Sequence, residues 1–167
     1  PAGNGVICLA FNSRDHVFAG TNGGGVFRST DSGDSWTPMG AGLTDSSVWS
    51  LAVDAADRVF AGTYDGGVFR STDNGDHWTP LGPPNTWVLS LAASGGGQTL
   101  AGTFGGGVLL STDSGDSWTA ANTGLTNSYV WSLAVGPGGR IFAGTGGGGV
   151  YRSVETVGLQ INAALGS

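Results

Sequence analysis

Acidic side chains are the groups in this 167-residue sequence best suited to chemistry. Four aspartates stand in stretches that differ along the chain: Asp45, Asp54, Asp57 and Asp65. Hydrolysis of a glycosidic bond requires two carboxylates that face one bond, and nothing in the spacing brings two of these together. The sequence contains one glutamate, Glu155. We therefore predict no catalytic residue and no enzymatic activity.

Three other chemical signals are weak. The segment GTGGGG at 144–149 matches G-x-G-x-x-G, but its siblings at 20–25, 62–67 and 102–107 join predicted strands, whereas a dinucleotide site opens a helix. His16 and His77 have no Cys or His neighbours at ligand spacing. Cys8 lies in the apolar run VICLAF and has no disulfide partner, so we expect a buried thiol. We expect neither a metal nor a cofactor.

Composition narrows the classes of partner. The net charge is −6, all six basic residues are arginines, and they form no cluster that could bind a phosphate backbone. No apolar stretch approaches the ~18 residues that cross a bilayer. The 33 glycines suggest disorder, but 39% hydrophobic residues, with six tryptophans, provide enough apolar surface to fold. We expect a globular domain that neither binds nucleic acid nor inserts into a membrane.

An internal repeat organises the elements that would position any site. The tripeptide AGT recurs at steps of 42, 40 and 42 residues, and the runs VICLAF, VWSLAV, VLSLAA and VWSLAV recur at the same steps. The repeats differ in length only between the tryptophan that they share (Trp36, Trp78 and Trp118) and the next apolar run. A rigid unit joined by a tolerant surface loop has this pattern.

Each repeat is predicted to form four short strands, which in the second repeat are 48–53, 58–63, 67–72 and 76–81. The first strand is apolar on both faces, as an innermost strand should be, and the last carries a proline, which is tolerated at an edge. About 42 residues of this kind make one β-propeller blade. We predict an all-β propeller of four-stranded antiparallel blades, in one domain (1–167), with blades at 6–38, 48–80, 88–120 and 130–163.

The fourth repeat departs from the pattern after its third strand. Val157, Leu159 and Ile161 alternate there, which predicts a divergent outer strand, with a disordered tail as the alternative.

The strongest local motif is the octapeptide STD[SN]GD[SH]W, at 29–36, 71–78 and 111–118. Its aspartate can accept backbone N–H groups within a tight turn, and its glycine can supply a positive φ. We expect its tryptophan to fix the hairpin to its own blade. The motif residues are Ser29, Asp31, Gly33, Trp36, Ser71, Asp73, Gly75, Trp78, Ser111, Asp113, Gly115 and Trp118.

This motif closely resembles the Asp-box, S-x-D-x-G-x-x-W, of bacterial neuraminidase-type repeats, as found in sialidase-like and photosystem-assembly-factor-like propellers. The fourth repeat departs from it, with Ser153, Val154 and Glu155 at the start. The resemblance implies a box between the third and fourth strands, structural rather than catalytic, on the face opposite the usual ligand site. It also favours an extracellular, cell-surface or periplasmic location. Because such propellers include glycosidases, receptors and assembly factors, it does not fix a function.

A sialidase-like enzyme would need an arginine cluster for the substrate carboxylate. Here most of the arginines share repeat positions, Arg28 with Arg70 and Arg152, and Arg58 with Arg140, which is typical of a scaffold. A sialidase-like glycosidase is kept as an alternative.

The candidate ligand face carries the second-to-third strand turns and the connections between blades, where the repeats differ. Exposed aromatic rings beside Asn and Asp would suit stacking on sugar rings or a protein hot spot. The alternative is that Trp87 and Tyr129 only pack between blades. The candidate residues are Asn22, Tyr64, Asp65, Trp87, Phe104 and Tyr129.

Four blades are few for a closed ring, and an open row would expose apolar faces at both ends. We predict a homo-oligomer in which two copies pair head to tail into an eight-bladed ring. The alternatives are a monomeric four-bladed ring and a fragment of a longer propeller. The predicted function is a noncatalytic binding or scaffold module, with a carbohydrate or protein ligand, and a purely structural or designed assembly unit remains a further alternative.

Overall fold

A computed structural model describes residues 5–153 and 161–165 of the chain. They form four antiparallel sheets, each of four strands hydrogen-bonded in chain order. The first sheet contains β1 (Val6–Phe11), β2 (Val17–Thr21), β3 (Val26–Ser29) and β4 (Thr37–Pro38). The second contains β5 (Val48–Val53), β6 (Val59–Thr63), β7 (Val68–Ser71) and β8 (Thr79–Gly82). The third contains β9 (Val88–Ala93), β10 (Thr99–Thr103), β11 (Val108–Ser111) and β12 (Thr119–Ala120), and the fourth β13 (Val130–Val135), β14 (Ile141–Thr145), β15 (Gly149–Ser153) and β16 (Ile161–Leu165).

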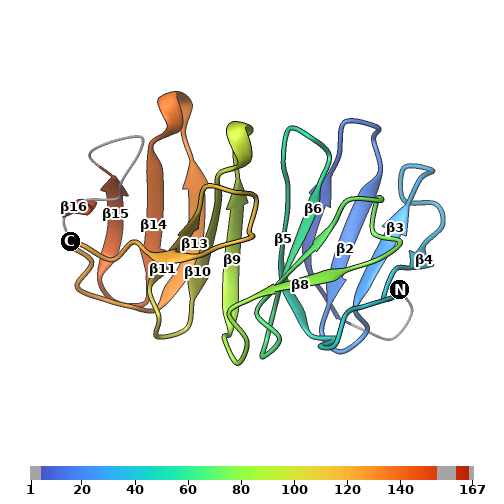
Figure 1. Ribbon diagram of the computed structural model, residues 1–167, viewed down its shortest axis with the longest axis horizontal. Coiled ribbons are helices and arrows are strands. Elements are labelled where there is room, and N and C mark those ends of the chain that lie inside the picture. Colours follow the sequence, from blue (N-terminus) through green and yellow to red (C-terminus); the bar gives the residue numbers. More distant parts are fainter. Residues whose placement is uncertain (1–4, 154–160, 166–167) are drawn as a thin grey trace.

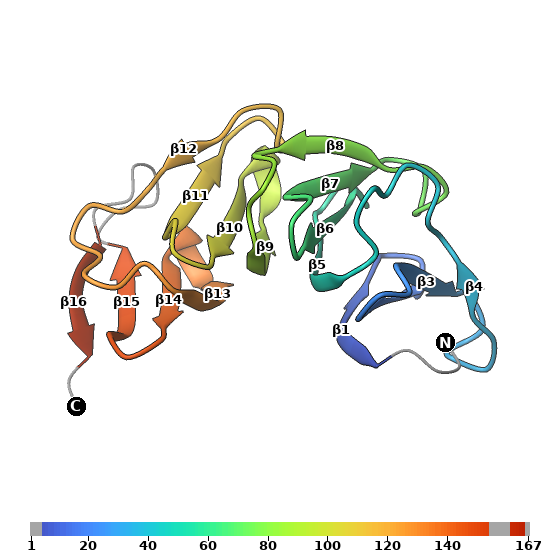
Figure 2. The same ribbon diagram turned by 90° about the horizontal axis from the view of Figure 1, so that it is seen from below.

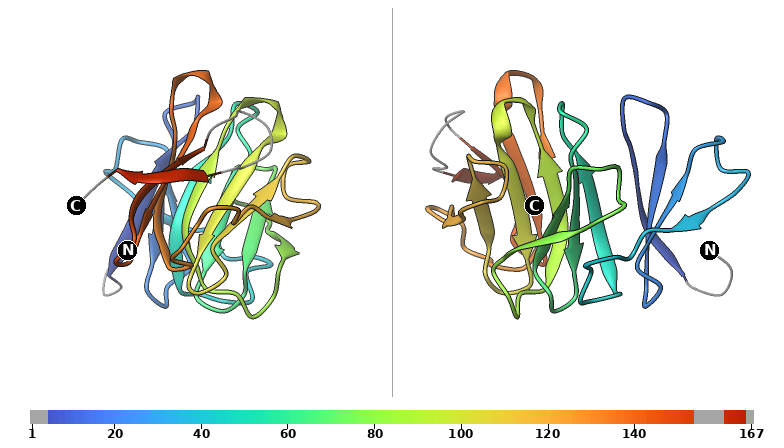
Figure 3. Two further views of the ribbon diagram at one scale, coloured as in Figure 1. Left: turned by 90° about the vertical axis from the view of Figure 1, so that its left-hand side faces the viewer. Right: turned by 45° about the vertical axis from the view of Figure 1, so that its right-hand side comes forward.

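The four sheets stand side by side as an open arc. In Figure 2 the first strands β5, β9 and β13 line the concave side, and the last strands β8 and β12 lie on the convex side. The right-hand view of Figure 3 shows the first sheet, in blue, at one end of the row. Sheets arranged radially in this way are propeller blades, so the predicted all-β propeller fold is confirmed.

The outer strands are shorter than the sequence pattern suggests. β4 and β12 have two residues each, because their pairing with the third strand stops after two positions. In the fourth blade β16 pairs with β15, with Ile161 opposite Ser153. Val157 and Leu159, which the alternation assigned to this strand, lie outside the described residues.

The core lies between blades rather than within one. Phe18 and Val26 of the first blade pack against Val48 and Leu51 of the second. Corresponding clusters join the second blade to the third and the third to the fourth. The second and third blades therefore bury one face against the blade before and one against the blade after, which explains why β5 and β9 are apolar on both faces apart from one serine each.

Every first strand contains a β-bulge at its second residue. In the second blade Val48 pairs with Thr63 and Ser50 with Gly62, which leaves Trp49 without a partner in the ladder. A bulge adds one residue and re-aims a side chain. The same irregularity places Ile7, Leu89 and Trp131 at the corresponding positions.

The arc has two rims with different contents. The upper rim in Figure 1 carries the first-to-second strand turns, including the short 3-10 turns η1 (Gly95–Gly97) and η2 (Pro137–Gly139). The lower rim carries the second-to-third strand turns and the connections between blades. Within residues 5–153 and 161–165, no helix is long and apolar enough to cross a membrane.

Candidate ligand-binding site

Six aromatic side chains form a continuous row on the lower rim, which we call the aromatic ridge. Trp87 lies at its centre, with ring centroids 4.5 Å from Tyr64 and 4.6 Å from Phe104. Phe104 in turn lies 4.7 Å from Tyr129. These distances are those of direct aromatic packing. The ridge consists of Trp49, Tyr64, Trp87, Phe104, Tyr129 and Trp131.

Ridge residues are large and apolar yet exposed. Tyr64 is 49% exposed, Phe104 45% and Trp131 49%, whereas Trp87 is half-buried beneath them. Trp87 stacks on Phe104 with an angle of 29° between the rings, and Trp49 meets Trp87 edge-on at 5.3 Å. Trp87 thus packs across blades, as the alternative interpretation held, but it also supports an exposed aromatic surface.

The backbone holds these rings in fixed places. The N–H of Tyr64 donates to the Ser47 carbonyl at 3.0 Å, and the N–H of Phe104 donates to the Trp87 carbonyl at 3.0 Å. Phe104 and Tyr129 also form an isolated antiparallel bridge. Turns and connections are therefore tied together, and the ridge is built on rigid backbone.

Polar groups flank the ridge at its Tyr64 end. The Asp45 carboxylate accepts the N–H groups of Ser47 at 2.9 Å, Asp65 at 2.7 Å and Gly66 at 3.2 Å. An open depression of about 420 Å³ lies here, lined by Thr44, Asp45, Ser46, Tyr64, Asp65 and Gly66. A ligand on the ridge would meet carboxylate and hydroxyl groups at this point.

At the other end Asn127 takes the place of Asp45. Its side-chain oxygen accepts the N–H of Tyr129 at 2.9 Å, and its amide donates to the Gly146 carbonyl at 2.8 Å. The rim thus repeats one bonding scheme with an acid in one blade and an amide in another.

The structure brings together four of the six candidate residues. Tyr64, Trp87, Phe104 and Tyr129 are in contact, and Asp65 follows Tyr64 in the same turn. Asn22 is exposed in the first blade, its N–H bonded to Gly5, with no ridge residue beside it in its own blade.

Sequence reasoning missed Trp49 and Trp131 because both lie in first strands, which the sequence predicts to be innermost and covered on both faces. The bulge takes them out of the ladder and turns their side chains towards the lower rim. The available signal was the identity of the second residue of each run, which is Ile7, Trp49, Leu89 and Trp131 in turn.

The three STD turns (29–36, 71–78 and 111–118) occupy the upper rim and share one geometry. In the second, the Ser71 hydroxyl accepts the N–H of Gly75 at 2.7 Å, and Asp73 accepts the N–H of His77 at 2.9 Å. The turn glycines have φ of 100°, 91° and 95°, as the sequence predicts. Hydrogen bonds from Ser35 and Ser29 lower the pKa of Asp31 to about 2. Hydrogen bonds from His77 lower the pKa of Asp73 to about 2, and hydrogen bonds from Ser117 lower the pKa of Asp113 to about 2.

The tryptophans of these turns differ from expectation. Trp78 does not fix its own hairpin: its indole N–H donates to the Met39 carbonyl at 2.8 Å, and its ring is buried in the cluster between the first and second blades. Trp36, in the first described blade, instead donates its indole N–H to the Gly33 carbonyl of its own turn at 3.1 Å. The tryptophan is an inter-blade anchor where a preceding blade exists.

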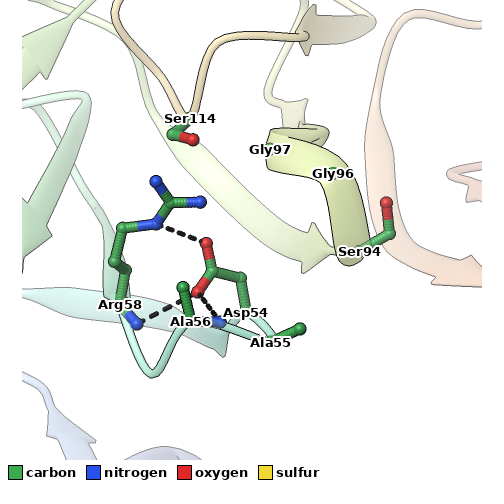
Figure 4. A pocket seen from close by; sticks show the side chains of 8 residues that line it. All are labelled: Asp54, Ala55, Ala56, Arg58, Ser94, Gly96, Gly97 and Ser114. Atoms are coloured by element: carbon green, nitrogen blue, oxygen red, sulfur yellow. Dashed lines mark hydrogen bonds and ion pairs between the residues drawn. The ribbon is translucent and has the colours of Figure 1, made fainter.

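A second depression, of about 390 Å³, lies at the upper rim between the second and third blades (Figure 4). Asp54 and Arg58 form an ion pair there at 2.6 Å, and Asp54 also accepts the N–H groups of Ala56 and Arg58. Figure 4 shows the pair facing Ser114 of the neighbouring blade. The Asp54 carboxylate is therefore occupied by bonds within its own turn. Among the eight residues drawn in Figure 4, no second acidic side chain lies beside it.

The remaining chemical candidates are dispersed. Asp57 bonds the Ser13 N–H at 2.9 Å, on the rim opposite Asp45 and Asp65. Burial raises the pKa of the Cys8 thiol to about 11. Within the described ranges, no three His, Cys, Asp or Glu side chains gather into a possible metal site.

Solved structures of similar fold share low sequence identity with this chain. An ancestral GH74 enzyme is 22% identical with a TM-score of 0.82, over 99% of this chain and 24% of that one. A GH74 xyloglucanase from Xanthomonas campestris is 19% identical with a TM-score of 0.79, over 99% and 31%. YCF48 bound to D1 peptide is 19% identical with a TM-score of 0.73, over 91% and 52%. The chain thus spans from about a quarter to about half of these proteins, and the likeness shows the fold alone.

No curated protein matches the chain. The family model described as the DUF6242 beta propeller domain matches residues 4–153, which includes every strand of the first three blades and β13–β15 of the fourth. The chain therefore belongs to the DUF6242 beta propeller domain family.

Proposed function

We propose that this chain is a noncatalytic binding module and that the aromatic ridge is its ligand surface. The observation that carries the proposal is the exposure of Tyr64, Phe104 and Trp131 in one contiguous row on rigid backbone. Contiguous apolar surface of this kind marks interaction sites. The residues differ between repeats, as in other repeat proteins that build a binding face on a common scaffold.

The chemistry of the ridge favours a neutral carbohydrate. Sugar rings stack on aromatic faces, and their hydroxyls donate to carboxylates such as Asp45 and Asp65 beside Tyr64. The solved neighbours include GH74 enzymes, one of them a xyloglucanase, which makes xyloglucan oligosaccharides the first probes to use. An extended peptide is the second candidate, because YCF48 is similar in fold and its structure holds the D1 peptide.

The distribution of charge argues against the sialidase-like alternative. Arg28 and Arg70 bond the next blade, and Arg58 pairs with Asp54 on the upper rim, so none of the three faces the ridge. A substrate carboxylate on the ridge would meet the side chains of Asp45 and Asp65 without a compensating cation. The absence of hydrolysis on xyloglucan and on a chromogenic sialoside would support the noncatalytic assignment, and turnover of either would refute it.

We also infer that the three STD turns are Asp-boxes with a structural role. Their aspartates and serines bond within their own turns, and Trp78 and Trp118 pack between blades. If the ligand bound at the STD turns instead, substitutions on the ridge would leave binding unchanged. The two possible sites therefore make opposite predictions for ridge variants.

Binding can be measured through the ridge itself. Trp87 lies at its centre and Trp131 at one end, so titration with xyloglucan oligosaccharides, and separately with cello-oligosaccharides, should change the tryptophan fluorescence. The triple variant Tyr64→Ala, Trp87→Ala, Phe104→Ala should lose the response and the binding heat. Because Trp87 is half-buried, the double variant Tyr64→Ala, Phe104→Ala tests the same surface with the core left intact.

The matched control is Phe11→Ala, which removes an exposed ring from the first blade, away from the ridge. It should bind as the parent does. If neither sugar series binds, while a panel of peptides binds and depends on Tyr64 and Phe104, the ligand is a peptide. Equal losses in the control and the double variant would overturn the assignment of the ridge, and a protein that binds no member of either panel would favour a purely structural unit.

A further inference from the structure

One arginine contact recurs between consecutive blades. The Arg28 guanidinium of the first blade donates to the Asn74 carbonyl at 2.7 Å and to the Asp76 carboxylate at 3.0 Å, both in the STD turn of the second blade. Arg70 makes the same pair of bonds to Ser114 at 2.8 Å and Asp116 at 2.9 Å in the third blade. The contact thus links the third strand of one blade to the STD turn of the next.

The arginine is present only where an STD turn follows it. The third blade is followed by the fourth, whose sequence lacks the STD motif, and Leu110 stands at the arginine position of the third blade. Leu110 is buried in the apolar cluster between those two blades. The arginine is therefore matched to its acceptor blade by blade and is not a uniform feature of the repeat.

At the two ends of the arc the arginine and the STD turn are both present but lie far apart in one chain. Between two chains they could meet as they do within the arc. Arg152 restores the arginine in the fourth blade, where the register pairs it with Phe142 as Arg28 pairs with Phe18. Paired residues on adjacent strands point to the same face, so Arg152 lies on the uncovered face of the fourth blade, and it is exposed. Asp34 and Ser32 hold the acceptor positions in the first described blade, and both are exposed.

We propose that the uncovered face of the fourth blade docks on the uncovered face of the first blade in a second copy of this chain, with Arg152 bonded to Asp34 and to the Ser32 carbonyl. The partner is a second copy because donor and acceptor both occur in this chain, at opposite ends, in the pattern that its internal interfaces use. The contact does not depend on the ridge or its ligand.

The apolar groups at the two ends complete the same pattern. Val48, Val88 and Val130 each pack on the glycine of the blade before, Gly20, Gly62 or Gly102, where a Cβ would lie within 3 Å of the valine side chain. These valines are 0% exposed, whereas their counterpart Val6 is 49% exposed.

The uncovered glycine is Gly144, beside which a Cβ would meet only the Ser132 side chain of its own blade. Val6 of one copy therefore fits over Gly144 of another. Val150 repeats the argument on the same face: it is 41% exposed, although its counterparts Val26, Val68 and Val108 are at most 1% exposed.

The shape of the arc permits both junctions at once. Figure 2 shows the first and fourth blades at the two ends of one arc, both on the same side of the second and third blades. A two-fold axis on that side would set each fourth blade against the first blade of the other copy. The assembly closes after two copies, with eight blades and no uncovered face.

Sedimentation equilibrium of the intact chain tests the assembly. We expect a single species at twice the 16.6 kDa mass of the chain. A species at the mass of one chain up to the solubility limit would overturn the proposal. So would larger polymers, because they would require junctions that do not close.

Substitution of the arginine tests the contact. Arg152→Leu copies what the third blade has at Leu110 and should raise the dissociation constant of the dimer about a hundredfold, since the ring holds the contact twice and each is worth about tenfold. The matched control is Arg14→Leu, which removes the same charge from a 61% exposed side chain that lies beside Asp57 of the second blade, away from the two faces of the proposed contact. It should leave the dimer unchanged, and equal losses in both variants would refute the assigned contact.

A charge exchange separates a specific contact from a general effect. Arg152→Asp and Asp34→Arg should each weaken the dimer, and the double variant should restore it. Both residues are exposed, so folding, followed by circular dichroism, should be unaffected. Val6→Glu places a carboxylate against the Gly144 face and should give folded monomers; a dimer that survives it would show that these faces do not meet.

Discussion

The two rims of the arc are built from the same repeats and use them in opposite ways. On the upper rim three STD turns repeat one hydrogen-bonding scheme, in which Ser71 and Asp73 bond groups of their own turn and Trp78 anchors the blade before. On the lower rim the corresponding turns carry Asn22, Tyr64 or Phe104, with their side chains in solvent. A rim that holds the blades together cannot vary, whereas a rim that faces solvent can.

The largest effect should come from the inter-blade anchor. Trp78→Ala should lower the free energy of unfolding by about 3–5 kcal/mol, because it opens a cavity in the cluster with Phe18 and Met39 and leaves the Met39 carbonyl without its donor. Trp131→Ala, which removes the same side chain from an exposed ridge position, should cost about 1 kcal/mol or less. Urea unfolding of the two variants measures the difference, and equal losses would erase the distinction between the rims.

A hydroxyl within an STD turn should have the next largest effect. Ser71→Ala removes the acceptor of the buried Gly75 N–H and a donor to Asp73, and should cost about 1–3 kcal/mol. Ser46→Ala removes an exposed hydroxyl from the lower rim and should change stability by less than about 0.5 kcal/mol. Thermal and urea unfolding of this pair would contradict the comparison if Ser46→Ala were the more damaging change.

Much of the fold could be predicted from the sequence, for a physical reason. The repeat fixes four equivalent units, and a strand that is apolar on both faces, such as 48–53, must be covered on both sides. The positive φ of Gly75 and the acceptor role of Asp73 follow from the turn chemistry of the motif itself. Features determined within one repeat were therefore accessible.

Features determined between repeats were not. The partner of Trp78 is Met39, 39 residues earlier, and no property of the motif reveals that contact. The bulge at Trp131 depends on the register of β13 against β14, so the sequence alone assigned that ring to the core. The sequence therefore predicted the ridge residues that lie in turns and connections, such as Tyr64 and Phe104. It missed Trp131, which reaches the ridge because of an irregularity in the strand ladder.

Ridge residues should contribute little to stability even where they contribute to binding. Phe104→Ala should lower the free energy of unfolding by about 1 kcal/mol, since it removes ring pairs with Trp87 and Tyr129 but opens no closed cavity. Urea unfolding measures the loss of stability in this variant, and a titration with the ligand that the parent protein binds measures the loss of affinity. A loss as large as that of Trp78→Ala would mean that the lower rim also holds the blades together.

The smallest effect per residue concerns acid. The aspartates of the STD turns, Asp31, Asp73 and Asp113, have pKa values lowered from 3.8 to about 2 by hydrogen bonds to the charged carboxylate. A folded-state pKa below the unfolded value stabilises the fold above about pH 4, and this stabilisation is lost as the pH falls from about 4 towards 2. The urea midpoint should therefore decrease over that interval. Ser117→Ala removes a donor to Asp113 while the charge is retained, so it should raise the folded-state pKa of Asp113 towards the ordinary value. The loss of stability should then be smaller and should end at a higher pH. An unchanged pH profile in that variant would show that the STD turn does not draw stability from its ionised carboxylate.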